Sequence, residues 1–431
     1  MTSAPTKRSV PGPENITRVV LDNGMVVLVR ENHAAPVVVA EGLLPTGSIH
    51  DPDGKTGLAG FVASMLMRGS ERYAFDEFNE IIEGVGANLS VNASDHTTDF
   101  GSTSLAEDFP TMVEVLADTL RRPQFPPEHM ARVRSQKLVR IQERDQDTQQ
   151  VANLRFFETI YGEHPYGRPT SGYAETVSAI QREDLLAFHA GHYAPQSAVI
   201  VVTGDVRTET AIDLIRAQFE DWRGDAAGTA EAQLVAPVQS TNGVNRLFYP
   251  LPGKYQSDIV IGCPAVARSH PDYDAIRVAN TVLGRFGMMG RLGETIREEQ
   301  GLAYYVYSAQ DANLAAGVWL AAAGVNPENV DVAVESILSE FARLGEEPPS
   351  EEELADSQAF MTGVLPLTLE TNEGVANTLL NMEWYGLGLD YIERYNDLIY
   401  GVSPADVQRV AATYLRSDRY TVVVAGPPSA G

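Results

Sequence analysis

Histidines at ligand spacing are the first residues to consider, because imidazole serves both metal binding and proton transfer. His189 and His192 have His-x-x-His spacing, but no Glu or Cys accompanies them at ligand spacing. We interpret them as a structural pair. His96 lies between Asp95 and Asp99, between two predicted strands. These three residues could form a metal corner, although we favour a polar turn.

Other kinds of reactive site have weaker support. Cys263 is the single cysteine, which excludes an internal disulfide framework. It follows an apolar stretch, so we expect a buried thiol. The stretch 284–287 reads Gly-Arg-Phe-Gly and does not fit the Gly-x-Gly-x-x-Gly pattern of dinucleotide sites. No Ser/His/Asp set can be detected from the sequence alone.

The charge balance narrows the classes of partner. The chain has 431 residues, with 32 basic and 58 acidic side chains and a formal net charge of −26. Such a charge repels nucleic acid and anionic membrane surfaces. No run of about 18 apolar residues occurs, so no membrane-spanning helix is expected. The first 15 residues are polar and lack an apolar signal core, from which we expect a cytoplasmic location.

The elements that must position any site are duplicated. Pro126-Pro127 precedes Ser135-Gln136, and Pro348-Pro349 precedes Ser357-Gln358, an offset of 348 − 126 = 222. The segments 151–153 and 375–377 both read Val-Ala-Asn, and each half closes on an apolar strand, 198–204 and 421–426. An internal repeat of this length predicts two similar folds. We predict an N-terminal domain over 1–222, a linker over 223–245 and a C-terminal domain over 246–431.

The order of elements predicts the fold class. Asn23-Gly24 indicates a hairpin over 18–30, and 36–43 reads as a further strand. Segments 87–92 and 97–102 read as a strand pair, while 105–121 and 129–157 read as long helices. Strands followed by runs of helices, twice over, predict an α+β fold with two similar halves, each an antiparallel sheet with helices.

One apolar helix, predicted over 57–67, lies in a distinctive frame. Residues 57–70 read Gly-Leu-Ala-Gly-Phe-Val-Ala-Ser-Met-Leu-Met-Arg-Gly-Ser. The frame Gly-Leu-Ala, Met-Leu and Gly-Ser resembles the zinc helix of the pitrilysin-like (M16, inverzincin) metallopeptidases. In that family the five middle positions read His-x-x-Glu-His, where two His bind Zn²⁺ and the Glu acts as general base. The resemblance implies the LuxS/MPP-like metallohydrolase fold, arranged as a clamshell.

The chemistry of that motif is missing from this chain. Gly60 and Ser64 stand at the two His positions, and Ala63 stands at the Glu position. None of them can bind zinc usefully or take a proton. The family completes its site with a Glu about 76 residues on. Here Arg140 or Ile141 falls nearest that place, and Glu143 is the closest carboxylate. We therefore expect no metal in this chain.

A second motif of the family is retained. Residues 291–304 are similar to its Arg-Leu-x-x-x-x-Arg-Glu-x-x-Gly-Leu-Ala-Tyr, and they place Arg297 and Tyr304 seven residues apart. The resemblance implies that this pair reaches a zinc site across a chamber, where a guanidinium and a phenol can donate to a substrate carbonyl or oxyanion. In the structural alternative, Arg297 forms a surface ion pair and Tyr304 only fills a place on a strand. Gly284, Gly287 and Gly290 suit a loop that approaches a peptide closely, although a plain turn serves equally well.

Together these features predict a particular kind of M16 chain. It resembles the zinc-less, Arg/Tyr-bearing chain of M16B-type heterodimers and of mitochondrial processing peptidase. We expect a partner subunit with His-x-x-Glu-His and Zn²⁺, and a peptide as substrate. We expect no cofactor in this chain, no nucleic acid and no membrane. The alternatives are a scaffold protein of the same fold and a homodimeric peptide-binding protein.

Overall fold

The chain forms two compact units, each assembled from three stretches of sequence. The computed structural model describes residues 10–224, 243–285 and 290–428. Unit 1 comprises Met1–Leu138, Thr170–Ala232 and Leu365–Tyr395, and unit 2 comprises Val139–Pro169, Gln233–Val364 and Asn396–Gly431. Each unit therefore includes a stretch from the other half of the sequence. The predicted boundary at 223–245 stays a prediction, because residues 225–242 lie outside the described part.

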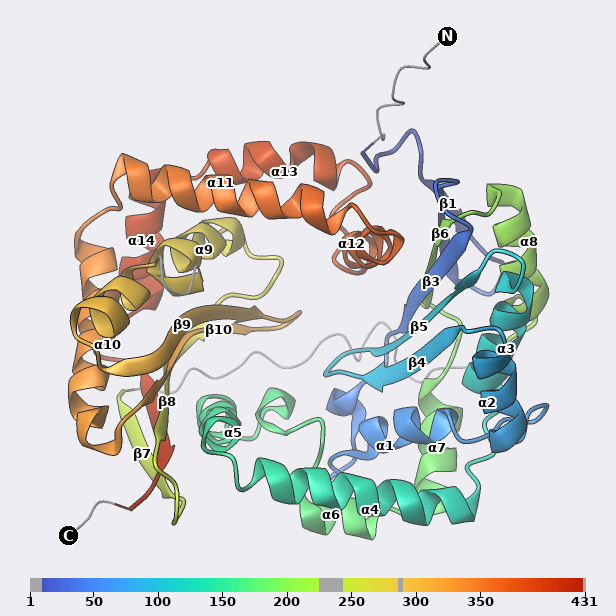
Figure 1. Cartoon of the computed structure of the whole chain (residues 1–431), viewed down its shortest axis with the longest axis horizontal. Helices are drawn as coiled ribbons and strands as arrows, with labels where there is room; N and C mark the ends of the chain where they lie inside the picture. The colour runs from blue at the N-terminus through green and yellow to red at the C-terminus, as the bar shows by residue number, and fades with distance from the viewer. Residues whose placement is uncertain (1–9, 225–242, 286–289, 429–431) are drawn as a thin grey trace. The chain divides into compact units, whose positions relative to one another are not determined.

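Unit 1 is built on a six-stranded sheet of order β1-β2-β6-β3-β5-β4 (Figure 1). Its strands are β1 (Thr17–Val20), β2 (Val26–Glu31), β3 (Val37–Leu44), β4 (Asn88–Ala93), β5 (Thr98–Leu105) and β6 (Val199–Gly204). β1 and β2 pair antiparallel around Asn23 and Gly24, and Gly24 has φ 88°, which a side chain would strain. The predicted hairpin is confirmed.

Unit 2 repeats this order in a five-stranded sheet, β7-β11-β8-β10-β9. Its strands are β7 (Asn245–Pro250), β8 (Ser257–Ala265), β9 (Ala303–Ala312), β10 (Gly317–Val325) and β11 (Thr421–Gly426). β11 pairs parallel with β7, as β6 pairs parallel with β2, and the other pairs are antiparallel. The predicted α+β fold is confirmed. The expectation that each sheet is antiparallel is corrected, because each sheet contains one parallel pair of strands. In each half, the last strand inserts beside the first long strand and runs parallel to it.

Helices pack on both sheets. Those of unit 1 are α1 (Leu58–Leu66), α2 (Phe75–Gly84), α3 (Phe109–Arg121), α6 (Ala174–Ala179), α7 (Arg182–His192), α8 (Thr208–Phe219) and α12 (Asn372–Trp384). Unit 2 contains α5 (Thr148–Tyr161), α9 (Tyr273–Asn280), α10 (Val330–Glu346), α14 (Pro404–Tyr414) and the π-helical segments η3 (Thr281–Arg285) and η5 (Gly293–Glu299). Short 3₁₀ turns are η1 (Ser48–His50), η2 (Pro165–Gly167) and η6 (Pro327–Asn329). The unit boundary falls inside α4 (Pro127–Arg144), α11 (Glu351–Thr368) and α13 (Tyr391–Tyr400).

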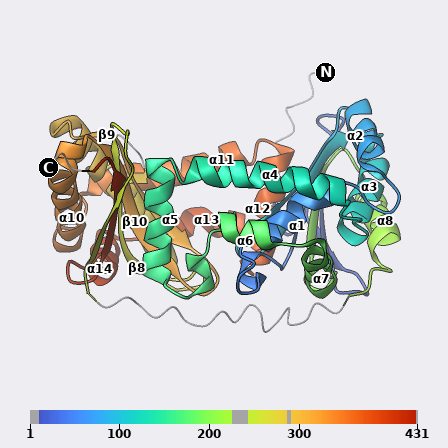
Figure 2. The ribbon, with the colours of Figure 1, turned by 90° about the horizontal axis from the view of Figure 1, so that it is seen from below.

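Two helices complete the sheet of the opposite half of the sequence. α12, from the second half, packs on β6 and β3 of unit 1 (Figure 1). α5, from the first half, packs on β11 and β8 of unit 2 (Figure 2). α12 buries its apolar side against the sheet, where Val375, Leu379 and Met382 join Leu28, Val39, Leu43 and Val201 in one core. The sheet of each half is thus covered by a helix that the other half supplies.

One predicted helix is broken in the structure. The segment 129–157 divides into α4 and α5, because Asp147 caps a new helix by accepting a hydrogen bond from the backbone N–H of Gln150. α11 begins with Glu351, Glu352 and Glu353 in its first turn, as expected of carboxylates at a helix N-terminus. Among the residues described, no helix has the length and apolarity that crossing a membrane requires.

Candidate functional site

The segment in which the sequence predicts a degenerate zinc motif forms α1, and this helix is buried on most sides. Phe61, Val62 and Met65 are each fully buried. Gly60 lies where a side chain would meet backbone, since a Cβ there would be 3.0 Å from the carbonyl oxygen of Thr170. Ser64 donates its hydroxyl to the Gly60 carbonyl at 2.8 Å, which is local helix bonding. The helix is therefore packed as an ordinary core element.

A lysine fills the place beside these residues. Lys137 of α4 donates its ammonium to the carbonyl oxygen of Gly60 at 2.8 Å, and its Nζ lies 5.8 Å from the ring centroid of Phe61. Arg134, one turn earlier, lies over the same ring at 5.9 Å. An ammonium beside Gly60 repels a divalent cation, and the donor set here is one carbonyl and one hydroxyl. These residues do not fit a zinc ion.

The start of α1 is held by a residue that the sequence reading did not single out. Asp51 is 3% exposed, and its carboxylate accepts hydrogen bonds from the backbone N–H groups of Gly57 and Ala59, both at 2.7 Å. A carboxylate that accepts at a helix N-terminus is stabilised by the helix dipole. The loop 51–57, which is rich in Asp and Gly, was the sequence signal for this cap. It was missed because Asp51 lies well before the first residue of α1.

The retained motif is in unit 2. Arg297 lies on η5, which ends at Glu299, and Gln300 and then Gly301 with φ 62° follow it. Tyr304 lies on β9. From the sequence, Gly301 is predicted to end the helix that holds Arg297, and Tyr304 is predicted to lie on the strand that follows. The structure confirms both predictions. Tyr304 is 82% exposed, so it is not a strand filler. The Arg297 side chain is 40% exposed, and its Nε lies 3.8 Å from Glu298 Oε1, a long and solvated ion pair worth little.

The predicted substrate-binding glycines have a structural reason for being small. A Cβ on Gly290 would lie 2.7 Å from the Cα of Gly284, and a Cβ on Gly284 would lie 3.0 Å from a methyl group of Leu292. The two glycines are buried and pack against each other. Gly287 lies outside the described residues. A role of these glycines in binding a peptide stays a prediction.

The remaining histidines and the cysteine have structural settings. His189 makes a hydrogen bond to the carbonyl oxygen of Leu120 at 2.8 Å, and its ring stacks on Tyr193. His192 lies 5.0 Å from His50 between ring centroids, and burial, together with the charge of His50, lowers the pKa of His192 to about 4. Cys263 is fully buried, and burial raises the pKa of its thiol to about 11. At neutral pH these groups are uncharged, with Cys263 fully buried and the two histidines half-buried.

The stretch around His96 is a polar turn between β4 and β5. Asp95 accepts a hydrogen bond from the Ser48 hydroxyl at 3.3 Å, and Asp99 accepts one from the Thr97 hydroxyl at 3.0 Å. Burial raises the pKa of both carboxyl groups. Within the described ranges, no three His, Cys, Asp or Glu side chains are grouped so that they could hold a metal ion.

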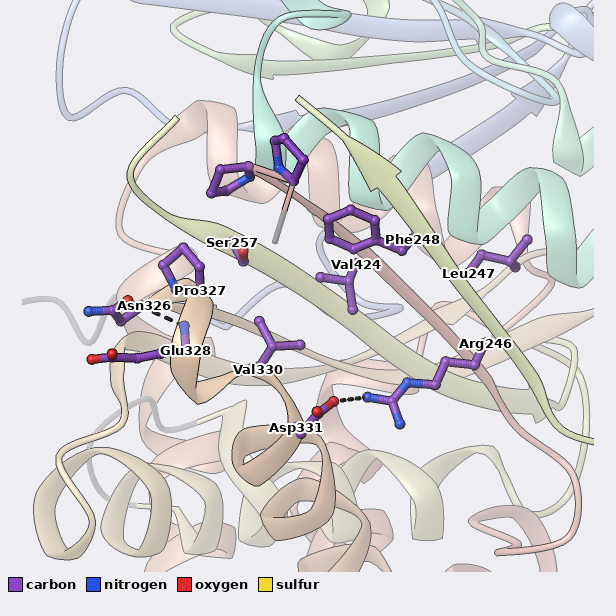
Figure 3. Close-up of a pocket in the computed structure, with 12 residues that line it drawn as sticks. Arg246, Leu247, Phe248, Ser257, Asn326, Pro327, Glu328, Val330, Asp331 and Val424 are labelled. Atoms are coloured by element: carbon purple, nitrogen blue, oxygen red, sulfur yellow. Dashed lines mark hydrogen bonds and ion pairs between the residues drawn. The ribbon is translucent and has the colours of Figure 1, made fainter. Parts of the chain in front are cut away.

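A separate groove of about 960 Å³ lies on unit 2 between β7, the end of β11 and the start of α10 (Figure 3). Phe248 and Val330 contribute apolar surface, and Arg246 makes an ion pair with Asp331 at its edge. At the corresponding place in unit 1, α8 packs on β2 and α3. The described residues that line the groove include none of the predicted site residues.

Comparisons with known proteins agree with the fold and with the family resemblance. The profile "Insulinase (Peptidase family M16)" matches residues 26–173, and the profile "Peptidase M16 inactive domain" matches residues 179–361. Together they span most of the chain, which belongs to the peptidase M16 family. The segment predicted to correspond to the family's zinc helix forms α1, and the segment with Arg297 and Tyr304 runs through η5 to β9.

Individual relatives cover most of the chain at low identity. An uncharacterized zinc protease of Mycobacterium tuberculosis is 29% identical over 402 residues, 92% of this chain and 89% of that protein. A probable mitochondrial-processing peptidase subunit beta of Arabidopsis thaliana is 27% identical over 61% of this chain and 49% of its own length. The crystal structure of a peptidase M16 inactive domain from Pseudomonas fluorescens superimposes with a TM-score of 0.87 at 24% identity, covering 96% of this chain and 98% of that one.

Proposed function

We propose that this chain is the non-catalytic subunit of a heterodimeric zinc metallopeptidase. The observation that carries the proposal is a contrast between its two motifs. At the first motif, Gly60, Ala63 and Ser64 bring no metal ligand, and Lys137 brings a positive charge. At the second motif, Arg297 and Tyr304 remain and are exposed. A chain that had become only a scaffold would have no need of this pair.

The roles of the two residues follow from their chemistry. The partner subunit, with His-x-x-Glu-His, would supply the zinc ion that activates a water molecule for peptide-bond hydrolysis. Arg297 and Tyr304 would each donate a hydrogen bond to the carbonyl oxygen of the scissile peptide, or to the oxyanion that forms from it. Such donors act most strongly where charge develops, so they should affect turnover more than substrate affinity.

The test is reconstitution with a His-x-x-Glu-His partner and a quenched fluorescent peptide. Arg297→Ala and Tyr304→Phe should each lower kcat by about 10²–10³ while the complex still assembles. Two exposed residues give matched controls: Tyr255→Phe, at a tyrosine that is 96% exposed, and Arg416→Ala, at an arginine paired with Asp418. Wild-type rates for both test variants in an intact complex would mean that the pair is structural, and the scaffold alternative would replace the proposal.

A further inference from the structure

Two buried charged side chains lie close to η5, the segment that carries Arg297. Glu340 of α10 is 3% exposed and Arg291 is 5% exposed, although charged side chains are rarely buried to this degree unless they are paired. Arg291 donates to the carboxylate of Glu353 from Nε at 2.8 Å and from Nη2 at 3.3 Å. The opposite charge, on Glu340, is therefore not the main partner of Arg291.

Glu340 is instead bonded to η5. Its Oε1 accepts hydrogen bonds from the hydroxyl of Thr295 and from Nη1 of Arg343, both at 3.0 Å. Thr295 lies two residues before Arg297 on the same π-helical segment. One helical turn earlier on α10, Ser336 donates its hydroxyl to the side-chain oxygen of Gln300 at 2.8 Å. α10 thus holds η5 on both sides of Arg297.

The segment needs such an anchor. A π-helix has wider turns and poorer packing than an α-helix, and it is rarely stable without tertiary support. In η5 the backbone N–H of Gln300 donates to the carbonyl oxygen of Thr295, five residues back, at 3.2 Å. The carbonyl and the hydroxyl of Thr295 therefore bond to different elements. Movement of this residue would rotate the turn on which Arg297 stands.

The surroundings of Glu340 make its charged form unfavourable in the folded state. Burial raises its pKa, Arg343 and Arg291 oppose that shift, and Glu299 on η5 adds to it. Its Oε2 is buried and has no hydrogen-bond partner among the described residues, and the same is true of Nη1 of Arg291. A buried carboxylate that is only half satisfied is a poor source of stability. Its contribution is better explained by the geometry it enforces.

We propose that Glu340 is a positioning residue for Arg297, which it orients through the hydroxyl of Thr295 and the π-helical turn. The role in catalysis rests on the function proposed above for Arg297. The anchor itself is a property of unit 2 and does not depend on a partner subunit. The two parts can therefore be tested separately.

The first test uses the purified chain alone and measures hydrogen exchange of the amides in 293–301. Thr295→Val removes the hydroxyl with little change of shape and should raise exchange there about five- to tenfold, as should Glu340→Met. Thr295→Ser keeps the hydroxyl and should exchange like the wild type. The matched control is Asp331→Asn, on the same helix, where an exposed carboxylate pairs with Arg246. Exchange in β9 and β10 reports on general unfolding.

The second test uses the reconstituted complex. Thr295→Val should lower kcat in the wild-type background and have no further effect in an Arg297→Ala background, because the hydroxyl acts through Arg297. Unchanged exchange in 293–301 for both Thr295→Val and Glu340→Met would overturn the anchor. Additive losses in the double variant would overturn the positioning role. If Arg297→Ala alone has no effect, the proposed function fails, and the exchange experiment still decides on the anchor.

Discussion

Lys137 donates its ammonium to the carbonyl oxygen of Gly60 at 2.8 Å, across 77 positions in the sequence. The contact joins α4 to α1 at the first of the three substituted positions, 60, 63 and 64. A Cβ on Gly60 would lie 3.0 Å from the backbone oxygen of Thr170 and 3.6 Å from Nζ of Lys137. The lysine therefore lies close to the place where a side chain at residue 60 would begin.

The first prediction concerns metal content. Because Lys137 and the residues at positions 60, 63 and 64 do not fit a zinc ion, the purified chain should hold no stoichiometric zinc at α1. Its unfolding temperature should not change on addition of a chelator. Elemental analysis after dialysis checks this. About one tightly held Zn²⁺ per chain that is lost on His96→Ala would contradict both the motif reading and the assignment of His96 to a polar turn.

The second prediction concerns the lysine itself. Lys137→Met keeps most of the apolar length of the side chain and removes the charged donor. We expect the free energy of unfolding to fall by about 1.5–2 kcal/mol, the lower part of the range for a hydrogen bond from a charged group, because the contact is only partly buried. Urea denaturation measures it. Arg140→Met, one turn further along α4 at an exposed position, is the matched control and should stay within about 0.5 kcal/mol. Equal effects of the two variants would mean that the contact contributes nothing specific.

The third prediction concerns pH. Glu41 on β3 folds over Gly101, and its pKa is raised to about 7, first by burial and then by the charges of Glu373 and Asp99. The folded state therefore holds this proton more tightly than the unfolded state does. Stability should fall as the pH rises from about 4.5 to about 7 and then level off.

Glu41→Gln removes this dependence. The variant should match the wild type below about pH 4.5 and be more stable above about pH 7, by about 1–2 kcal/mol once solvent screening of a partly exposed group is allowed for. Thermal denaturation at several pH values measures it, with the exposed Glu370→Gln as control. A wild-type advantage at high pH would show that the Glu41 carboxylate is stabilised rather than penalised by its surroundings.

The fourth prediction concerns helix α12, which the second half of the sequence supplies to unit 1. Leu379 is fully buried against the sheet of unit 1, so Leu379→Ala should cost about 2–5 kcal/mol. Because α12 packs on β6 and β3, amide exchange should rise in those strands and not in β8 and β10 of unit 2. Asn377→Ala, on the exposed side of the same helix, is the control. Faster exchange in β8 and β10 alone would contradict the assignment of α12 to unit 1.

Much of the local structure could be predicted, because its signals are local. Asn23-Gly24 indicated a hairpin, Gly301 indicated the end of η5, and the repeated Val-Ala-Asn blocks indicated two similar halves. The break between α4 and α5 was missed, because a helix period can continue through Asp145 and Asp147 until a capping bond is seen. The parallel pairing of β6 and β11 was also missed, because alternation along a strand does not reveal its neighbours.

By itself, the sequence determined the fold class and the family resemblance, and it predicted the loss of the metal ligands, since each depends on residue types at fixed spacing. Only the tertiary structure decided which long-range partners meet. It brought Lys137 to Gly60, joined Glu340 to Thr295, and laid α12 on the sheet of the opposite half. These contacts leave no periodic pattern, because they arise when separately encoded faces pack together and each buried polar group must find a partner within hydrogen-bond distance.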